Sequence, residues 1–443
     1  MLSFKTFLSE AAEPNWSGER NFVGHGDNAR EFMENLIMPY HVYDPVKHAV
    51  NEALMEHAEL AHLPYADEYL KSANRDHDTG ARVLHHIRKG AEAAFPEGEH
   101  EHTRVAKHKE AVNHWNNFKH DYEQSENSRR HAVGHPKKLS LGRGSNLMSS
   151  NGKYDPEKHV GAAAHGKKVK ILGLALAPHS IAGGNNVCPK ATKGCKSTCL
   201  ALHAGMNQGE ERNYHLKVAR TQFLQKHPEH AVRMLSHEVQ RHAVGAKKKG
   251  FEPAVRLNAN SDLNIEHLLP HHYWNKFGKG GQHEVKHYDY TKVAGRMNSA
   301  SKRENLAKKG YHLTLSSTGT GHSESNDKDV SKHLHSGGNA AVVFRTRAHN
   351  ELPHTLVVHH PNGTQTAHPV HNANERDDRY NDHEHHAGGS PEHHKFLAAN
   401  PHIERGSGHV SGLTFKGNTK KDLEHTEFAV NSHKGVAHIQ GHL

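Results

Sequence analysis

The chain has 443 residues, of which 34% are hydrophobic, and its 57 lysines and arginines outnumber 48 acidic residues, giving a formal net charge of +9. The length predicts two or three domains, and no run of about 18 apolar residues occurs, so we expect no ordinary membrane-spanning helix and no membrane partner. The three cysteines lie too close together for the disulfide framework of a secreted protein, which favours a reducing cytosol.

Fifty histidines are spread over the whole chain. A metal-storage tract would concentrate them in one segment of low complexity. We therefore interpret most of them as general surface residues, with a dedicated metal-binding or pH-sensing role as the alternative. Because histidine titrates close to neutrality, the net charge should change steeply between about pH 5 and 7. Closely spaced histidines are poor evidence for metal ligands in such a chain.

Residues 1–20 form a separable leader. The opening MLSFKTFLSEAA predicts a short amphipathic helix that ends before Pro14. The segment is either a frayed N-terminal helix or a processed leader. It resembles the leaders of tailed-bacteriophage proteins, in which a Phe-rich helix precedes a Leu-x-Glu site cut by the prohead protease, and Leu8, Ser9 and Glu10 match that site. This resemblance implies packaging in the phage head.

Residues 21–125 are predicted to form a helical N-terminal region, because apolar residues such as Phe32 and Leu36 recur at helical spacing. The region carries no recognisable catalytic spacing. Residues 126–138 are polar and basic, which predicts a linker. The rest of the chain, 139–443, is predicted to form one α/β domain.

In this domain short apolar segments alternate with helical ones, which predicts parallel strands. The helix expected after the cysteines covers 211–250, and the Asn-, His-, Asp- and Gly-rich residues 372–410 predict a loop. Polar residues recur at the C-terminal ends of the expected strands, where barrel folds assemble their reactive groups. We therefore predict a modified or incomplete (β/α) barrel-like domain. The expected strands are 169–177, 254–262, 284–292, 311–317, 340–346 and 355–361, with a last pair around 411–416 and 426–430.

The three cysteines, Cys188, Cys195 and Cys199, follow the first expected strand in the pattern C-x6-C-x3-C. Thiolate is the metal-binding form of cysteine, and clustered thiolates let one loop supply several soft ligands. In one interpretation they hold three irons of an iron–sulfur cluster and leave the fourth iron open for a small molecule. Radical S-adenosylmethionine enzymes use this arrangement, with S-adenosylmethionine as the second cofactor, but their usual spacing is C-x3-C-x2-C.

In a second interpretation, His203 joins Cys188, Cys195 and Cys199 in a tetrahedral Cys3His zinc site. The three-residue gaps between 195, 199 and 203 would place these side chains on one face of a helix. Such a closed site would be structural. A third interpretation leaves the cysteines unligated in a core, and all three interpretations fit the spacing.

Arg256, Asp262 and Lys292 stand at the ends of two neighbouring expected strands. They are candidate catalytic residues, because an arginine, a carboxylate and a lysine can bind an anionic substrate or transfer protons beside the cysteine site. The alternative is a salt-bridged rim with a structural role. The chain has no Walker loop, no GxGxxG after a strand and no HExxH, so nucleotide hydrolysis, dinucleotide redox chemistry and zincin proteolysis lose support.

The lysine-rich segment 245–250 is most often a solvated helix end rather than a nucleic-acid patch. The basic composition permits contact with nucleic acid or another polyanion without requiring it. A basic nucleic-acid-binding factor is therefore a third hypothesis for the function.

These motifs, in this order, resemble the gene product 88 family of bacteriophage proteins over about residues 139–430. Members open with a Leu-Ser-x-Gly-Asn-like segment and continue with a CP…C…CYA run, an arginine-led strand ending in an acid, and a YTK strand. CLA replaces CYA here, and Asn260-Ser261-Asp262 stands where Ser-Gly-Asp is common. The matching residues are Ser140, Gly144, Asn146, Cys188, Pro189, Cys195, Cys199, Arg256, Asn258, Asp262, Tyr290, Thr291 and Lys292, followed by a late acidic stretch at Asn374, Asp377, Asp378 and Arg379.

The resemblance implies a phage protein that acts in the host cytoplasm or is carried inside the virion, and it supplies no reaction. Our leading hypothesis is a phage iron–sulfur enzyme, similar to radical S-adenosylmethionine enzymes, that acts on an unknown substrate. The alternative is a non-enzymatic internal or structural phage protein whose cysteines bind zinc to stabilise the fold.

Overall fold

The computed structural model describes residues 88–94, 99–132, 137–142, 144–149, 169–183, 186–199, 201, 211–320, 322–323, 325–346, 351–374, 388–415 and 428–441. Several predicted segments lie outside these ranges: the leader, the N-terminal region up to residue 87, His203, and the residues Asp377, Asp378 and Arg379 of the late acidic stretch.

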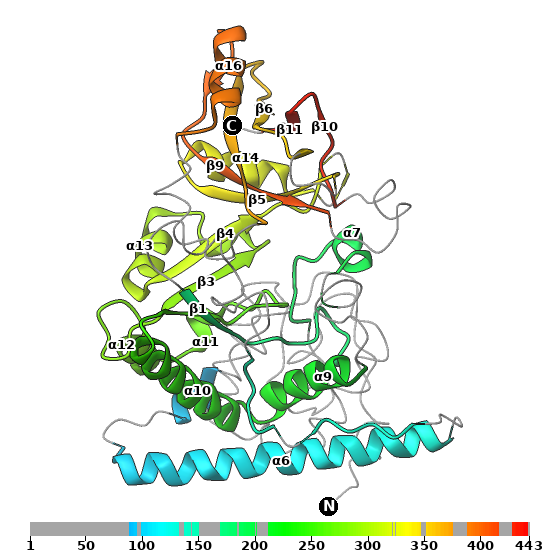
Figure 1. Cartoon of the computed structure of the whole chain (residues 1–443), viewed down its shortest axis with the longest axis vertical. Coiled ribbons are helices and arrows are strands. Elements are labelled where there is room, and N and C mark those ends of the chain that lie inside the picture. The colour runs from blue at the N-terminus through cyan, green and yellow to red at the C-terminus, as the bar shows by residue number, and fades with distance from the viewer. Residues whose placement is uncertain are drawn as a thin grey trace, which may run out of the picture.

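One large sheet organises the described residues (Figure 1). Strands β1 to β5 lie side by side in chain order, and each pairs in parallel with the next. Strand β9 follows β5, also in parallel, and the sheet continues through β7, β6, β11 and β10. The strands are β1 Val169–Gly173, β2 Glu252–Arg256, β3 Lys286–Thr291, β4 Tyr311–Ser316, β5 Asn339–Phe344, β6 Thr355–His359, β7 Gln365–Asn372, β8 Glu404–Arg405, β9 His409–Thr414, β10 Ser432–His433 and β11 Val436–Gln440.

Helices connect the successive parallel strands, so the predicted mixed α/β architecture is confirmed. The single helix expected at 211–250 is two helices, because Pro228 has no backbone N–H and starts the second one. No helix within the described ranges is long and apolar enough to cross a membrane. The helices are α6 Glu101–Ala132, α7 Lys193–Ser197, α9 Glu211–Lys226, α10 Pro228–Lys248, α11 Ile265–Leu268, α12 His271–Phe277, η4 Ala294–Arg296, α13 Ala300–Lys309, α14 Asp327–His335 and α16 Pro391–Ala399.

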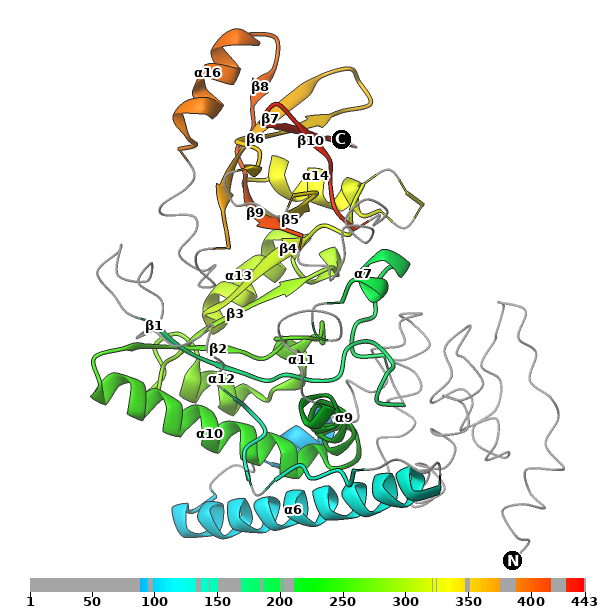
Figure 2. The ribbon, with the colours of Figure 1, turned by 45° about the vertical axis from the view of Figure 1, so that its right-hand side comes forward.

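The long helix α6 lies along the base of the molecule, beneath α9 and α10 (Figures 1 and 2). Trp115 is fully buried on this helix and packs against Phe223 of α9, with ring centroids 5.1 Å apart. The helix runs on to Ala132, so our prediction of a linker from residue 126 is wrong for 126–132. Composition suggested a linker, but tertiary contacts hold this turn, since buried Arg130 pairs with Glu211 of α9.

The prediction of a loop at 372–410 is also wrong in part. Residues 391–399 form α16, and the strand expected around 411–416 is β9, which already begins at His409 and inserts between β5 and β7. His409 of β9 is almost fully buried in this position. A polar composition predicted solvent exposure, but the strand is covered on both sides by parallel neighbours.

The segment that opens the α/β domain is held to α10 by a buried carboxylate. Glu238 accepts hydrogen bonds from the N–H groups of Leu147 and Met148, both at 2.8 Å. Burial raises the pKa of Glu238 to about 7. The segment then pairs in antiparallel fashion with the end of β1, through Ser149 and Gly173. The opening segment of the domain therefore reaches the edge of the sheet where the parallel strands end.

We predict that acid destabilises the folded chain through buried histidines. Burial lowers the pKa of fully buried His287 from 6.5 to about 3, so the folded chain binds fewer protons than the unfolded chain between these values. The contribution of His287 to stability is therefore full above pH 6.5 and decreases as the pH falls, with a loss of about 3 kcal/mol at pH 4. Buried Glu238 and Asp289 have raised pKa values and the opposite dependence, so the contribution is measured as the difference between the wild type and His287→Gln. Urea unfolding at pH 7.5, 6, 5 and 4 measures this slope.

His287→Gln should flatten the slope while keeping a partner for the Tyr273 hydroxyl, which shares a 3.0 Å hydrogen bond with His287 Nε2. The matched control is His272→Gln on α12, because that side chain is exposed. Equal slopes in the wild type and in His287→Gln would show that His287 does not control acid stability.

Candidate functional site

The loops after β1, β2 and β3 meet at the carboxyl edge of the parallel sheet. The cysteine loop follows β1, and α7 within it lies on the side toward which β3 and β4 point (Figures 1 and 2). Two backbone hydrogen bonds join this loop to the one after β2. Val187 O accepts from Asp262 N at 2.7 Å, and Leu174 O accepts from Ala259 N at 3.1 Å. The structure thus brings the predicted cysteine and Asp262 segments together.

Cys188 lies inside this junction. Its sulfur accepts a hydrogen bond from His179 N at 3.3 Å and stands 3.6 Å from Asn260 O. Burial, together with the nearby Asp262, Cys195 and Cys199, raises the pKa of the Cys188 thiol to about 12. Cys188 is therefore a neutral thiol near neutral pH, and a bound cation would be needed to stabilise its thiolate.

The other two cysteines are half-buried on and beside helix α7. Thr192 caps this helix by accepting a hydrogen bond from Cys195 N at 3.1 Å, and Cys199 follows its last turn. Across the described ranges, no group of three or more His, Cys, Asp or Glu side chains is arranged to hold a metal ion. The Cys3His site also requires His203, which lies outside these ranges. The iron–sulfur and zinc sites stay predictions.

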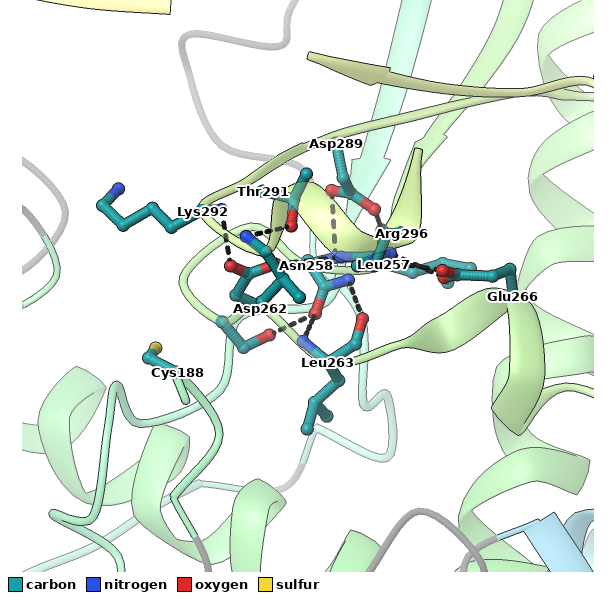
Figure 3. A network of polar contacts seen from close by, with 12 residues as sticks. Cys188, Leu257, Asn258, Asp262, Leu263, Glu266, Asp289, Thr291, Lys292 and Arg296 are labelled. Carbon is teal, nitrogen blue, oxygen red and sulfur yellow. Dashed lines mark hydrogen bonds and ion pairs between the residues drawn. The ribbon is translucent and has the colours of Figure 1, made fainter. Parts of the chain in front are cut away.

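Asp262 belongs to a buried ion-pair network (Figure 3). One of its carboxylate oxygens accepts from Lys292 N at 2.7 Å, and the other accepts from Arg296 Nη1 at 2.9 Å. Arg296 also donates two hydrogen bonds to the carboxylate of Glu266 in α11, at 2.6 and 2.9 Å. Both oxygens of Asp262 are thus engaged by the protein itself.

A second buried carboxylate, Asp289, continues the network along β3. It accepts hydrogen bonds from Leu257 N at 3.1 Å, Asn258 N at 3.0 Å and the Tyr311 hydroxyl at 2.9 Å. Burial raises the pKa of Asp289 to about 7. Asp289 therefore fixes the end of β2 relative to β4, which keeps the loop that carries Asp262 in place.

Asn258 shapes that loop. Its side-chain oxygen accepts from Ser261 Oγ at 2.8 Å and from Leu263 N at 2.9 Å, while its amide nitrogen donates to Leu263 O at 2.9 Å. These three hydrogen bonds close the backbone turn that directs the Asp262 side chain toward Arg296.

Arg256 lies on the other face of the sheet. Residues alternate between faces along a strand, so Val255 and Leu257 pack in the main core whereas Arg256 follows Ala254 on the opposite face. There the guanidinium stands over the rings of Tyr288 and Tyr290, at 5.6 and 5.2 Å from their centroids. Arg256 also lies 3.8 Å from Asp289 Oδ1.

Lys292 shares this second face. Its ammonium group donates to Ser316 Oγ at 3.2 Å and lies 5.2 Å from the ring centroid of Phe428. No carboxylate of the described chain is within ion-pair distance of this half-buried amine, although Asp262 holds the backbone of the same residue. Figure 3 shows the side chain extending away from the network, on the same side of it as Cys188.

The sequence did not predict Arg296, Glu266 or Asp289 as residues of the site. Asp289 left a signal, because a carboxylate in the middle of the strand KHYDYT is costly to bury unless it is paired. The sequence holds no such signal for Arg296 or Glu266, since a charged residue is common in short helical segments such as theirs. Only the fold places them beside Asp262.

We predict that Arg296 is structural and that Lys292 is not. Arg296→Leu leaves two buried carboxylates unpaired and should lower the free energy of unfolding by about 3–5 kcal/mol. Lys292→Met removes one hydroxyl contact and should cost less than about 1 kcal/mol. Urea denaturation followed by circular dichroism measures both.

If Arg296→Leu fails to fold, Arg296→Lys replaces it in the measurement. A lysine keeps the positive charge but can form only one of the two ion pairs, so the loss in free energy of unfolding should be intermediate. A cost for Lys292→Met as large as that for Arg296→Leu would support the salt-bridged rim instead.

Comparison with known proteins identifies one family. A family model described as Gene product 88 matches residues 145–406, which include the cysteine loop, the Asp262 loop and Lys292. Neither the curated proteins nor the solved structures gave a match. The match confirms the resemblance of the motifs and covers more than half of the sequence. The chain therefore belongs to the bacteriophage gene product 88 family.

Proposed function

We propose that this phage protein is an enzyme that binds an anionic substrate at the carboxyl edge of its parallel sheet, beside a metallocentre on the cysteine loop. The supporting observation is the 2.7 Å hydrogen bond between Val187 O and Asp262 N, which joins the cysteine loop to the loop after β2. Ligands in open α/β sheets bind at this edge because the loops that carry reactive groups meet there.

An incomplete (β/α) barrel is the architecture that we propose for this site. Strands β1 to β5 and then β9 run parallel, and the first five follow chain order, as in barrel enzymes. Such enzymes place their reactive side chains at the carboxyl ends of the strands. Lys292 and Ser316 occupy these positions after β3 and at the end of β4.

Lys292 is the proposed anion-binding residue. Its ammonium group has a hydroxyl partner and an aromatic ring beside it but no paired carboxylate in the described chain. A half-buried cation without a counter-charge attracts an anionic group of a ligand. Arg256 lies on the same sheet face and adds positive charge. Asp262 acts as a positioning residue, because its oxygens hold Lys292 N and Arg296.

An iron–sulfur cluster is the proposed cofactor, held by Cys188, Cys195 and Cys199. When bound, such a cluster supplies one-electron chemistry. The donor type favours it, because three cysteines in one loop can supply soft thiolate ligands. The described side chains do not form a ready three-ligand group, so we assign no reaction step to the cluster. Zinc is the alternative metal.

Metal analysis of anaerobically purified full-length protein tests this proposal. A cluster predicts about four iron atoms per chain and a broad visible absorption. Cys188→Ala, Cys195→Ala and Cys199→Ala should each abolish iron binding, whereas Lys190→Ala should not. Lys190 is the matched control, since it is exposed and lies in the same loop.

The possible outcomes separate the hypotheses. Iron together with binding of S-adenosylmethionine supports the enzyme, and the binding should weaken in the cysteine variants. A colourless protein with about one zinc per chain, whose removal lowers the melting temperature, supports the structural alternative. A protein without metal after anaerobic purification contradicts both.

A further inference from the structure

The opposite edge of the sheet, where strands β2 to β4 begin, carries a concentration of lysines. Helices α10, α12 and α13 end at this edge, because each runs back along the sheet before the next strand starts. In Figure 1 helices α12 and α13 lie on the left and α7, with the cysteine loop, lies on the right. We call this surface the basic edge, and its lysines are Lys247, Lys248, Lys249, Lys279, Lys286 and Lys308.

Contacts between these elements show that the basic edge is one surface. Lys279 N donates to Lys309 O at 3.3 Å, which joins the turn after α12 to the end of α13. Gly280 N donates to Glu284 Oε2 at 3.0 Å, which ties the turn after α12 to the segment before β3. Lys286 at the start of β3 lies opposite Ala254 of β2, the strand that begins directly after α10. The end of α10, the turn after α12 and the start of β3 are therefore neighbours.

The basic edge carries more lysines than acidic residues, which are Glu252, Glu284 and Glu304. Lys286 pairs with Glu284 at 3.4 Å and Lys308 with Glu304 at 2.8 Å. Lys247, Lys248 and Lys249 are exposed, and none of them pairs with a carboxylate of the described residues. One basic residue is enough to complement the negative end of a helix dipole, so three consecutive lysines exceed what α10 requires.

We propose that the basic edge binds the phosphate backbone of double-stranded DNA without reading its sequence. Neighbouring strands are about 4.8 Å apart, so the three strands β2 to β4 and their flanking helix ends present a surface roughly 10–15 Å wide. Duplex DNA carries one charge per about 1.7 Å of its axis, so this width faces several phosphates. Lysine suits this role, since it binds phosphate as a point charge on a flexible stem.

The basic edge fits nucleic acid better than a lipid surface. Amphipathic segments that bind membranes insert an apolar face beside their lysines. Val244, which is 51% exposed, is the one large apolar side chain exposed near these lysines in the described chain. The surface is also independent of the proposed metallocentre, because the cysteine loop lies at the opposite edge of the sheet.

Fluorescence anisotropy with a 25-base-pair duplex of arbitrary sequence tests the proposal, using the full-length chain at pH 8, where histidines are neutral. Each phosphate contact should contribute about −0.9 to the slope of log K against log salt. We expect K247Q/K248Q/K249Q to weaken binding at 50 mM salt by at least ~100-fold and to reduce the slope by roughly 2.7. The three side chains are exposed, so the variant should fold as the wild type does.

The matched control is K109Q/K328Q/K395Q, which removes the same charge from exposed positions on α6, α14 and α16. This control should retain wild-type affinity and slope. An equal loss in both triple variants would show that net charge rather than the basic edge drives binding, which overturns the proposal. Absence of DNA binding by the wild type at 50 mM salt also overturns it, as does binding to anionic lipid vesicles but not to DNA.

Discussion

The buried guanidinium of Arg296 is the interaction on which the carboxyl edge depends. It joins Asp262 in the loop after β2 to Glu266 in α11, and its own segment follows β3. Removing ions from water is costly, so the network is stable only while all three charges remain paired. The loops after two neighbouring strands are therefore fixed as a unit.

This constraint reaches the cysteine loop through the backbone. Asp262 is held by Arg296 through its side chain and by Val187 O through its N–H. Movement of the loop after β2 would therefore carry Cys188 and its neighbours along. The same carboxylate holds the backbone of Lys292, which leaves the lysine side chain directed away from the network.

The two edges of the parallel sheet differ in their electrostatics. At the carboxyl edge, the buried side chains of Asp262, Glu266 and Arg296 pair with one another, and half-buried Lys292 has no paired carboxylate in the described chain. At the amino edge, helix ends carry exposed lysines in excess of their acidic neighbours. Helix direction explains the difference, because in βαβ units every helix ends where the next strand begins.

The sequence alone determined the alternating α/β architecture, the family and the segments of the site, because strand periodicity and motif order are local properties. The expected strands 169–177, 254–262 and 284–292 overlap β1, β2 and β3, although β1 already ends at Gly173 and β2 at Arg256, so that Asp262 lies in a loop. The tertiary structure decided the rest. Tertiary contacts determine that Asp262 pairs with Arg296, that β9 lies between β5 and β7, and that α6 continues through the first part of the expected linker. These outcomes depend on contacts between residues distant in the chain, where burial and ion pairing override local composition.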